Sequence, residues 1–344
     1  MSVPDPAPAR KHSRIGLYAP FAVALVVVLV WSGFWLLARQ RTANGLEAAA
    51  QGLRDSGYEV SWKSSRIAGY PFRLFVVLEE PQVRDPSGWG LAAPRLEAES
   101  FLHGLGHWVM AAPQGLTVFR PSGGGVTLTG EVIRASLGKL DARPPSFSFE
   151  AAKVAFVPAP GAATFALAAA EKIELHLRAG PDDQGAVLLR VDGGRAAPGR
   201  LLGILADDKP VSLVWDSVLS GMSGFRGEDW AAAARAWSLS GGGVTVRQGG
   251  LSAGEAALNV QSGALTLGPD GRLRGALAVE LRRAPAALSA LARTGAIPPE
   301  TAEAAAAVIA ARQAGGSEAR ADLVFQAGRT TLGPVALGPA PRVY

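Results

Sequence analysis

One unbroken apolar stretch, residues 15–38, constrains this chain more than any other feature. No charged residue interrupts it, and at a helical rise of about 1.5 Å per residue such a run crosses a hydrocarbon core of about 30 Å. Tyr18, Trp31 and Trp35 supply aromatic rings of the kind that settle at membrane interfaces. The stretch therefore predicts a single transmembrane anchor that carries the rest of the 344-residue chain.

A cleaved signal peptide is one alternative, but its apolar core would be shorter and would be followed by small residues at a cleavage site. Residues 36–41, Leu-Leu-Ala-Arg-Gln-Arg, offer no such site. A buried helix of a soluble domain would not normally be apolar on every face. Three basic residues precede the run and two follow it. The positive-inside rule therefore favours a cytoplasmic N-terminus and a domain on the other side of the membrane.

The net charge of +5 is concentrated around the anchor. Residues 1–41 contain five of the 34 Lys and Arg residues and one of the 29 acidic residues, so the remainder has 29 basic and 28 acidic residues. A nucleic-acid-binding domain usually carries a basic face, and this domain has no surplus with which to build one. We therefore expect no nucleic acid among the partners. The absence of Cys excludes disulfides, thiolate metal sites and a Cys nucleophile.

The order of segments predicts four parts. Residues 1–14, rich in Pro and Ala, are expected to be a disordered cytoplasmic tail. Residues 15–38 are the anchor, and residues 39–56 continue it as an amphipathic stalk helix. Residues 57–344 form a β-rich periplasmic domain, in which short apolar runs are broken by Gly and Pro. The helical spacing in the stalk is that of Leu46, Ala49, Ala50 and Leu53.

Strand periodicity recurs along the domain. Tyr58, Val60 and Trp62 alternate with polar residues, which is typical of a strand with two different faces. Residues 268–271, Gly-Pro-Asp-Gly, lie between two apolar runs and predict a hairpin. Helices are expected in only two places of the domain. One begins at Glu228, and one begins at Pro298 and ends at Gly315-Gly316.

This pattern predicts a mainly β domain with a few helices, of the α+β class. We expect a large, mostly antiparallel sheet, either curved or folded into a sandwich, preceded by one transmembrane helix.

Two patterns that carry chemistry in other proteins are weak here. Gly250–Gly254 matches G-x-S-x-G around Ser252, but a nucleophile elbow needs a helix after it and a later His, and the last His is His176. His103 and His107 have a spacing that could bind a metal on a helix, yet the Gly residues between them make a helix poor. We predict no catalytic residue, no cofactor and no metal site, and a protein that is not an enzyme.

The most distinctive string is Gly-Tyr-Pro-Phe-Arg-Leu at residues 69–74. Gly-Tyr-Pro predicts a turn that leads into an apolar strand over residues 72–78. Alternate residues of that strand are apolar on both faces, so each face must be covered by protein or by a ligand. The candidates for a structural turn or for contact with an apolar ligand are Gly69, Tyr70, Pro71, Phe72, Leu74 and Val76.

Several strings occur in a fixed order: the anchor, Gly57–Trp62, residues 69–74, Trp237–Gly242, the hairpin over residues 263–277 and the ending 332–341. In this order they resemble a bacterial family catalogued as domain of unknown function 2125. The resemblance implies a membrane-associated bacterial protein with its domain in the periplasm, and it supplies no catalytic residues. The anchor, stalk and long β region are also similar, in architecture alone, to AsmA-type envelope proteins, which are linked to lipid movement.

Two functions fit these features. In the first, the chain is a non-enzymatic protein of the bacterial inner membrane whose β domain shelters or hands over a lipid or another apolar ligand. Its partners are then the membrane, and lipid or envelope proteins. In the second, it is a periplasmic interaction scaffold with a closed core and no ligand. A sheet curled around a long apolar cleft favours the first, a filled sandwich the second, and a pocket of perturbed titratable groups would favour an enzyme.

Overall fold

The computed structural model describes residues 15–142, 144–295, 297–312, 318–333 and 335–344. Their strands join into one sheet of 20, in which each pair of neighbours is antiparallel. The predicted α+β class with a large antiparallel sheet is confirmed, and the sheet is curved and open. The expected tail and the Gly315-Gly316 helix end lie outside the described residues.

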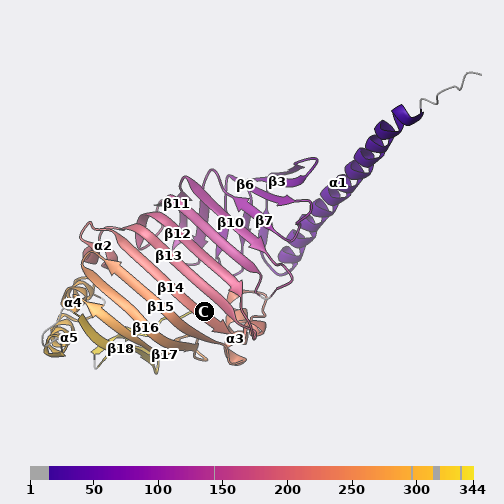
Figure 1. Ribbon diagram of the computed structural model, residues 1–344. Coiled ribbons are helices and arrows are strands. Elements are labelled where there is room, and N and C mark those ends of the chain that lie inside the picture. The colour runs from indigo at the N-terminus through magenta and orange to yellow at the C-terminus, as the bar shows by residue number, and fades with distance from the viewer. Residues whose placement is uncertain (1–14, 143, 296, 313–317, 334) are drawn as a thin grey trace, which may run out of the picture.

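Ten strands make the main run of the sheet and follow one another in chain order (Figure 1). The predicted hairpin at residues 268–271 joins two of them, and the amide of Gly271 donates to the Gly268 carbonyl oxygen at 3.0 Å. The ten strands are β11 (Ser146–Pro158), β12 (Leu167–Ala179), β13 (Gly185–Ala196), β14 (Val211–Ser220), β15 (Gly243–Ala253), β16 (Ala256–Leu267), β17 (Leu273–Arg282), β18 (Glu318–Gln326), β19 (Arg329–Leu332) and β20 (Val335–Pro339).

At β11 the sheet divides into two arms, because the two halves of this strand pair with different neighbours. Residues up to Ala152 pair with β10, and residues from Ala155 pair with β9. The first arm consists of β10 (Val132–Gly138), β7 (Trp108–Ala111), β6 (Arg95–Phe101), β3 (Arg73–Glu79) and β2 (Ser64–Ala68). The second arm consists of β9 (Gly124–Thr129), β8 (Leu116–Arg120), β5 (Gly90–Ala92), β4 (Gln82–Arg84) and β1 (Glu59–Ser61).

Helix α1 (Ile15–Asp55) joins the predicted anchor and stalk in one continuous element. Its first half projects away from the domain, and its second half lies against the domain (Figure 1). There it contacts both β1 and β2, the last strands of the two arms. The helix therefore spans the space between the arms. Gly57 follows it with a φ of +86°, a left-handed conformation that suits the end of a helix.

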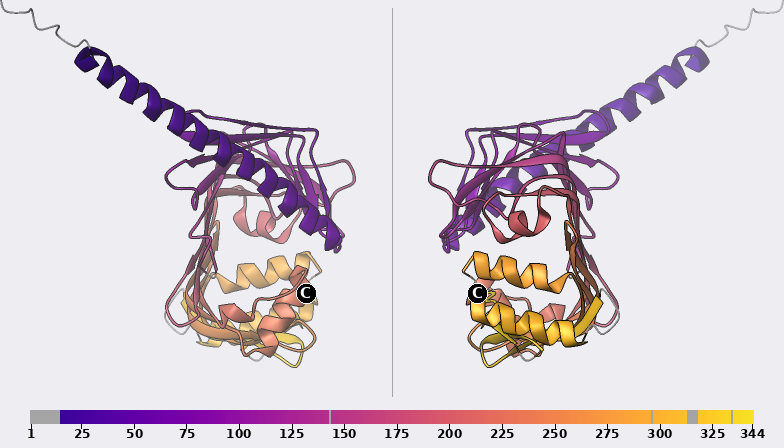
Figure 2. Two further views of the ribbon diagram at one scale, coloured as in Figure 1. Left: turned by 90° about the vertical axis from the view of Figure 1, so that its right-hand side faces the viewer. Right: turned by 90° about the vertical axis from the view of Figure 1, so that its left-hand side faces the viewer.

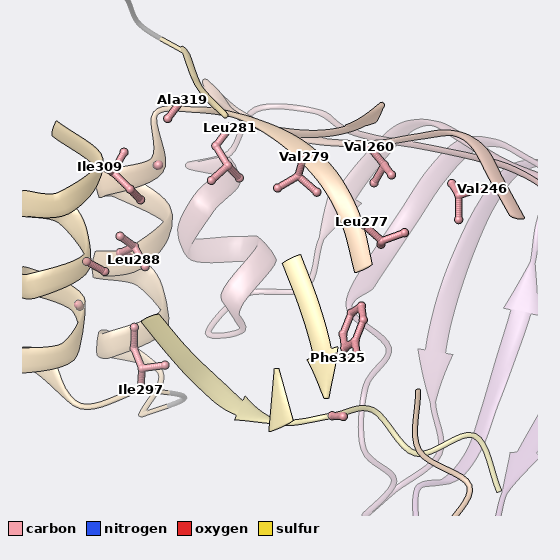
Figure 3. Packing of buried hydrophobic residues seen from close by; sticks show 14 of the residues in the cluster. Val246, Val260, Leu277, Val279, Leu281, Leu288, Ile297, Ile309, Ala319 and Phe325 are labelled. Carbon is pink, nitrogen blue, oxygen red and sulfur yellow. The ribbon is translucent and has the colours of Figure 1, made fainter. Parts of the chain in front are cut away.

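The main run has one polar and one apolar face, because directly opposed residues of antiparallel strands share a face. The row that begins at Glu150 is polar at both ends: it continues through Glu174 and Arg190, passes Val214 and Gly250, and ends with Asn259, Glu280 and Arg320. The adjacent row begins at Ala151 and points to the opposite face. It is apolar throughout and consists of Ala151, Ile173, Val191, Leu213, Leu251, Leu258, Leu281 and Ala319. Seen along its length, the sheet is curved (Figure 2). The apolar face packs against helices on the concave side (Figure 3), and we call it the inner face.

Helices cover the far end of the inner face. In Figure 2 the orange and yellow helices lie within the curve of the sheet. In Figure 3, Leu288 of one helix and Ile309 of the next lie beside Leu281 of β17, and Leu277 and Val279 point to the same side of the sheet. The helices of the domain are α2 (Leu201–Ala206), the 3-10 turn η1 (Met222–Gly224), α3 (Trp230–Leu239), α4 (Ala284–Arg293) and α5 (Pro299–Arg312).

Two of these helices were predicted and two were not. Helix α3 begins after Asp229, whose carboxylate accepts a hydrogen bond of 2.7 Å from the Ala232 amide, a usual helix cap. Helix α5 occupies the second predicted segment. Helices α2 and α4 were missed, and both pack on the inner face or on each other.

Candidate functional site

Residues 69–72 form a turn between β2 and β3 that packs on α1. The indole of Trp31 donates a hydrogen bond of 2.8 Å to the Pro71 carbonyl oxygen. The hydroxyls of Ser32 and Tyr70 are 2.9 Å apart. The turn expected from the sequence is therefore present, and it contacts the end of the apolar run.

Gly69 has the backbone freedom that this turn needs. Its φ is +102°, in the left-handed range that favours glycine. A Cβ at this position would lie 2.8 Å from the carbonyl oxygen of Arg73. The amide of Arg73 in turn donates to the Gly69 carbonyl oxygen at 3.0 Å. The chain thus passes too close to itself here for a side chain.

The strand after the turn is covered on both faces by protein. Leu74 is fully buried against α1, and Val76 and Val77, on opposite faces, are both buried. Phe72 departs from the predicted pattern, because it precedes β3 and 63% of its surface is exposed. None of the six candidate residues lines the cavity described next. Their contact with an apolar ligand stays a prediction.

An apolar cavity of about 390 Å³ lies between the two arms of the sheet, under the second half of α1. Ligand pockets in proteins usually measure about 300–1,000 Å³, so the space is large enough for a small ligand or part of a lipid chain. Its walls come from α1, from both arms and from β11. The lining includes Leu46, Ala49, Ala50 and Leu53 of α1 and Val60, Trp62, Leu91, Met110, Ile133, Phe147 and Phe149 of the domain.

Few polar groups reach this cavity. Its polar lining residues are Ser61, Gln82 and Arg134. Arg134 is directly opposite Glu150 on the polar face of the sheet, and its guanidinium is bound there by Glu150, with 2.6 Å between Nη2 and Oε2. Moving a charged group into such surroundings costs several kcal/mol unless it is paired. The cavity therefore suits an aliphatic chain better than a charged substrate.

The apolar surface continues beyond the cavity, because Phe149 begins a row of directly opposed residues that crosses the inner face. In the middle of this row, Leu175 and Leu189 are only half-buried. The row consists of Phe149, Leu175, Leu189, Trp215, Gly249, Val260, Val279 and Ala321. It joins the cavity under α1 to the core beneath α4 and α5.

Tyr58 links the end of α1 to the segment before α3. Its hydroxyl donates a hydrogen bond of 3.0 Å to the Glu228 carbonyl oxygen. Burial, and to a lesser degree the carboxylates of Asp85 and Asp229, raise the pKa of Tyr58 above its ordinary value. A tyrosine hydroxyl is protonated at neutral pH even at its ordinary pKa of about 10, so it can donate here, and this contact holds the base of α1 beside α3.

The residues considered for catalysis or metal binding have other structural contacts. Ser252 lies within β15, which turns into β16, so the helix of a nucleophile elbow does not follow it. Nδ1 of His176 is 2.9 Å from the Ser148 hydroxyl, and the rings of His103 and Phe101 are 5.4 Å apart. In the described parts of the chain, no group of three or more His, Cys, Asp or Glu residues could hold a metal ion.

Sequence reasoning missed part of the cavity wall. Phe147 and Phe149 line it from β11. Their signal is the alternation Ser-Phe-Ser-Phe at residues 146–149, which places both rings on one face of a strand.

A family model described as an uncharacterized protein conserved in bacteria matches residues 35–341. No curated protein and no solved structure matches the chain. The match covers the turn, the cavity and the sheet. The architectural likeness to AsmA-type envelope proteins is not confirmed.

Proposed function

Because the chain belongs to the bacterial DUF2125 family, we propose that it is an envelope protein, anchored in the inner membrane, whose β domain shelters an apolar chain such as that of a lipid. The cavity under α1 carries this proposal. Each methylene that leaves water for such a site contributes about 0.8 kcal/mol. The proposed activity is binding and handover, with no catalysis and no cofactor.

Helix α1 supports the anchor. It contains a stretch long and apolar enough to cross a membrane. The large apolar side chains from Tyr18 to Val30 are exposed rather than packed on the domain, whereas a core helix of a soluble protein would bury them. The basic residues at the ends of the apolar run favour a domain in the periplasm.

A reporter fusion tests this orientation. Alkaline phosphatase placed after Tyr344 is expected to be active in a Gram-negative host, because the enzyme matures only outside the cytoplasm. An inactive phosphatase fusion beside an active cytoplasmic reporter would reverse the orientation.

The open sheet favours shelter of a ligand over the alternative, a periplasmic scaffold with a closed core. In a filled sandwich a second layer would cover the inner face along its whole length. Here the middle strands keep Leu175 and Leu189 half-buried, between the cavity and the far core. A chain longer than the cavity would find further apolar surface along this row.

Lipid retention by single variants tests the function. Leu53 and Leu91 both line the cavity and keep 38% and 44% of their surface exposed. Replacing either with Glu would place a carboxylate in the cavity with little loss of packing. Leu239→Glu, on the exposed end of α3, is the matched control.

The full-length variants would be purified in a mild detergent and analysed by native mass spectrometry. We expect Leu53→Glu and Leu91→Glu to lose bound lipid that the wild type and Leu239→Glu retain. Lipid held around the anchor is the same in all four proteins, so the difference reports on the cavity. Equal lipid in all of them, with unchanged folding, would favour the scaffold.

A further inference from the structure

Four exposed apolar side chains gather at the end of the first arm, where α1 leaves the domain. They are Tyr70 and Phe72 in the turn before β3, and Phe101 and Leu105 at the turn between β6 and β7. We call them the apolar tip. In Figure 1 the strands β3 and β6 lie in the arm beside α1. Clustered exposed apolar residues of this kind commonly mark an interaction surface.

The apolar tip is held in place by the fold. Phe101 is directly opposite Arg73 in the sheet. The Leu102 amide donates to the Phe72 carbonyl oxygen at 3.0 Å, so the two turns are joined. The Trp108 indole donates to the Leu105 carbonyl oxygen at 3.0 Å. The exposed side chains therefore stand on a bonded framework, which reduces the conformational entropy lost when they insert into a partner.

Contacts with α1 fix the position of the apolar tip along the helix axis. The Phe72 ring lies 6.1 Å from the Trp31 ring, and the Pro71 carbonyl accepts a hydrogen bond from the same indole. Trp31 precedes the end of the apolar run, Ala38, by seven positions, or about 10 Å of helix. The tip is thus beside a part of α1 that belongs to the membrane-crossing stretch.

The chemistry at this level suits a membrane interface. Trp31, Tyr70 and Phe72 form an aromatic group of the kind enriched where hydrocarbon meets headgroups. Arg39 and Arg73 stand beside it. Arg39 donates to the Ile67 carbonyl oxygen at 3.2 Å, and Arg73 packs over the Phe101 ring at 5.4 Å and pairs with Glu99 at 2.8 Å, so among the described residues Arg39 is the cation of the two without an acidic partner at this position. Long cationic side chains can extend toward lipid phosphates while their stems stay on apolar surface.

We propose that the apolar tip inserts into the same leaflet that holds the C-terminal end of the α1 apolar run, so that the domain contacts the lipid surface directly as well as through its anchor. This rests on the membrane anchor of the proposed function. Two attachments would fix the orientation of the sheet against the bilayer. The cavity would then begin at Leu46, eight residues beyond Ala38, about 12 Å along the helix.

Single cysteines test the insertion, because the chain has no Cys of its own. Phe72→Cys and Phe101→Cys would each carry an NBD fluorophore in the full-length protein. The bilayer would be phosphatidylethanolamine and phosphatidylglycerol, with or without nitroxide on the acyl chains. Val27→Cys, on the exposed surface of α1, reports on the anchor, and Leu239→Cys on α3 serves as the aqueous control.

We expect blue-shifted emission and strong quenching by nitroxide lipid at Phe72, Phe101 and Val27, and neither effect at Leu239. Quenching at Val27 with aqueous emission at both tip positions would overturn the insertion and leave the anchor intact. Aqueous emission at Val27 would overturn the anchor itself. A blue shift at the tip without lipid quenching, together with cross-linking between two Phe72→Cys chains, would assign the tip to a second copy of the protein instead.

Discussion

The indole nitrogen of Trp35 donates a hydrogen bond of 2.9 Å to the carbonyl oxygen of Arg73, the first residue of β3. Trp35 is buried in a cluster with Leu74 and Leu102, yet it belongs to the apolar run. The bond therefore joins the apolar run directly to the sheet, with no linker between them.

Replacing Trp35 with Phe should weaken the packing of α1 on the sheet. The variant keeps an aromatic ring but leaves the Arg73 carbonyl without this donor, and we expect a loss of about 1–3 kcal/mol in the free energy of unfolding. Thermal unfolding of the full chain in detergent would measure it. Trp89→Phe, which alters an exposed indole, is the control. Equal melting temperatures for the two variants would contradict a role for the Trp35 bond.

Gly69→Val should destabilise the turn before β3. The φ of +102° disfavours any side chain, and the new Cβ would meet the Arg73 carbonyl oxygen at 2.8 Å. We expect about 1–3 kcal/mol of lost stability, measured by denaturant unfolding. Gly104→Val, in the neighbouring turn with no heavy atom within 4 Å of the added Cβ and no positive φ, should cost much less. A wild-type midpoint for Gly69→Val would show that the turn relaxes freely.

Local features of the fold could be predicted from the sequence. The apolar run predicted the first half of α1, and residues 268–271 predicted a hairpin. Glu228 was predicted to begin a helix, and α3 begins two residues later, at Trp230. Each depends on side chains a few positions apart. Helix α4 was missed although Pro285 lies in its first turn, because no polar cap residue marks its start. It begins after Arg283, which has a φ of +54° and makes no side-chain cap.

Long-range features could not be predicted in this way. The division of β11 between β10 and β9 depends on which strands meet in space, and strand periodicity identifies faces but not partners. The cavity could not be predicted for the same reason, because it depends on which elements meet in space. The spacing of Leu46 and Leu53 predicted a helix face, and the alternation of Val60 and Trp62 predicted a strand face. Nothing local indicates that these faces enclose one space together with Phe147.

Glu255, in the turn between β15 and β16, should make the stability of the protein depend on pH. Its carboxylate accepts a hydrogen bond from Lys209 at 3.1 Å and pairs with Arg283 at 2.6 Å. These two contacts, the Lys209 bond first, lower the pKa of Glu255 below its ordinary value. A lowered pKa means that the stabilisation is present above the unfolded-state pKa and is lost as the pH falls through the folded-state pKa.

Glu255→Gln should therefore lower the melting temperature slightly at pH 7, and the difference from wild type should close as the pH falls below about 4. Glu303→Gln, which changes an exposed carboxylate on α5, is the control. A difference that stays constant or grows on acidification would show that the ion pairs with Lys209 and Arg283 are not its cause.

The adjacent residues Leu188 and Leu189 of β13 offer the sharpest test of what the inner face binds. Successive strand residues point to opposite faces. Leu189 belongs to the row that joins the cavity to the far core, while Leu188 is opposite His176 and Asp216 in a row of the outer face. Both side chains are half-buried, so the pair differs in face rather than in burial.

A photoreactive benzoylphenylalanine at position 189 should cross-link to phospholipid in intact cells, and the same group at position 188 should not. Mass spectrometry of the purified protein would identify the adduct. The expected difference arises because the two adjacent side chains of β13 point to opposite faces of the sheet. Residue 189 would face the apolar chain, and residue 188 would face water. The same group at position 149 would probe the cavity itself, which Phe149 lines. Lipid adducts at position 149 and at neither 188 nor 189 would confine the ligand to the cavity. Adducts to other proteins at all three positions would favour the scaffold.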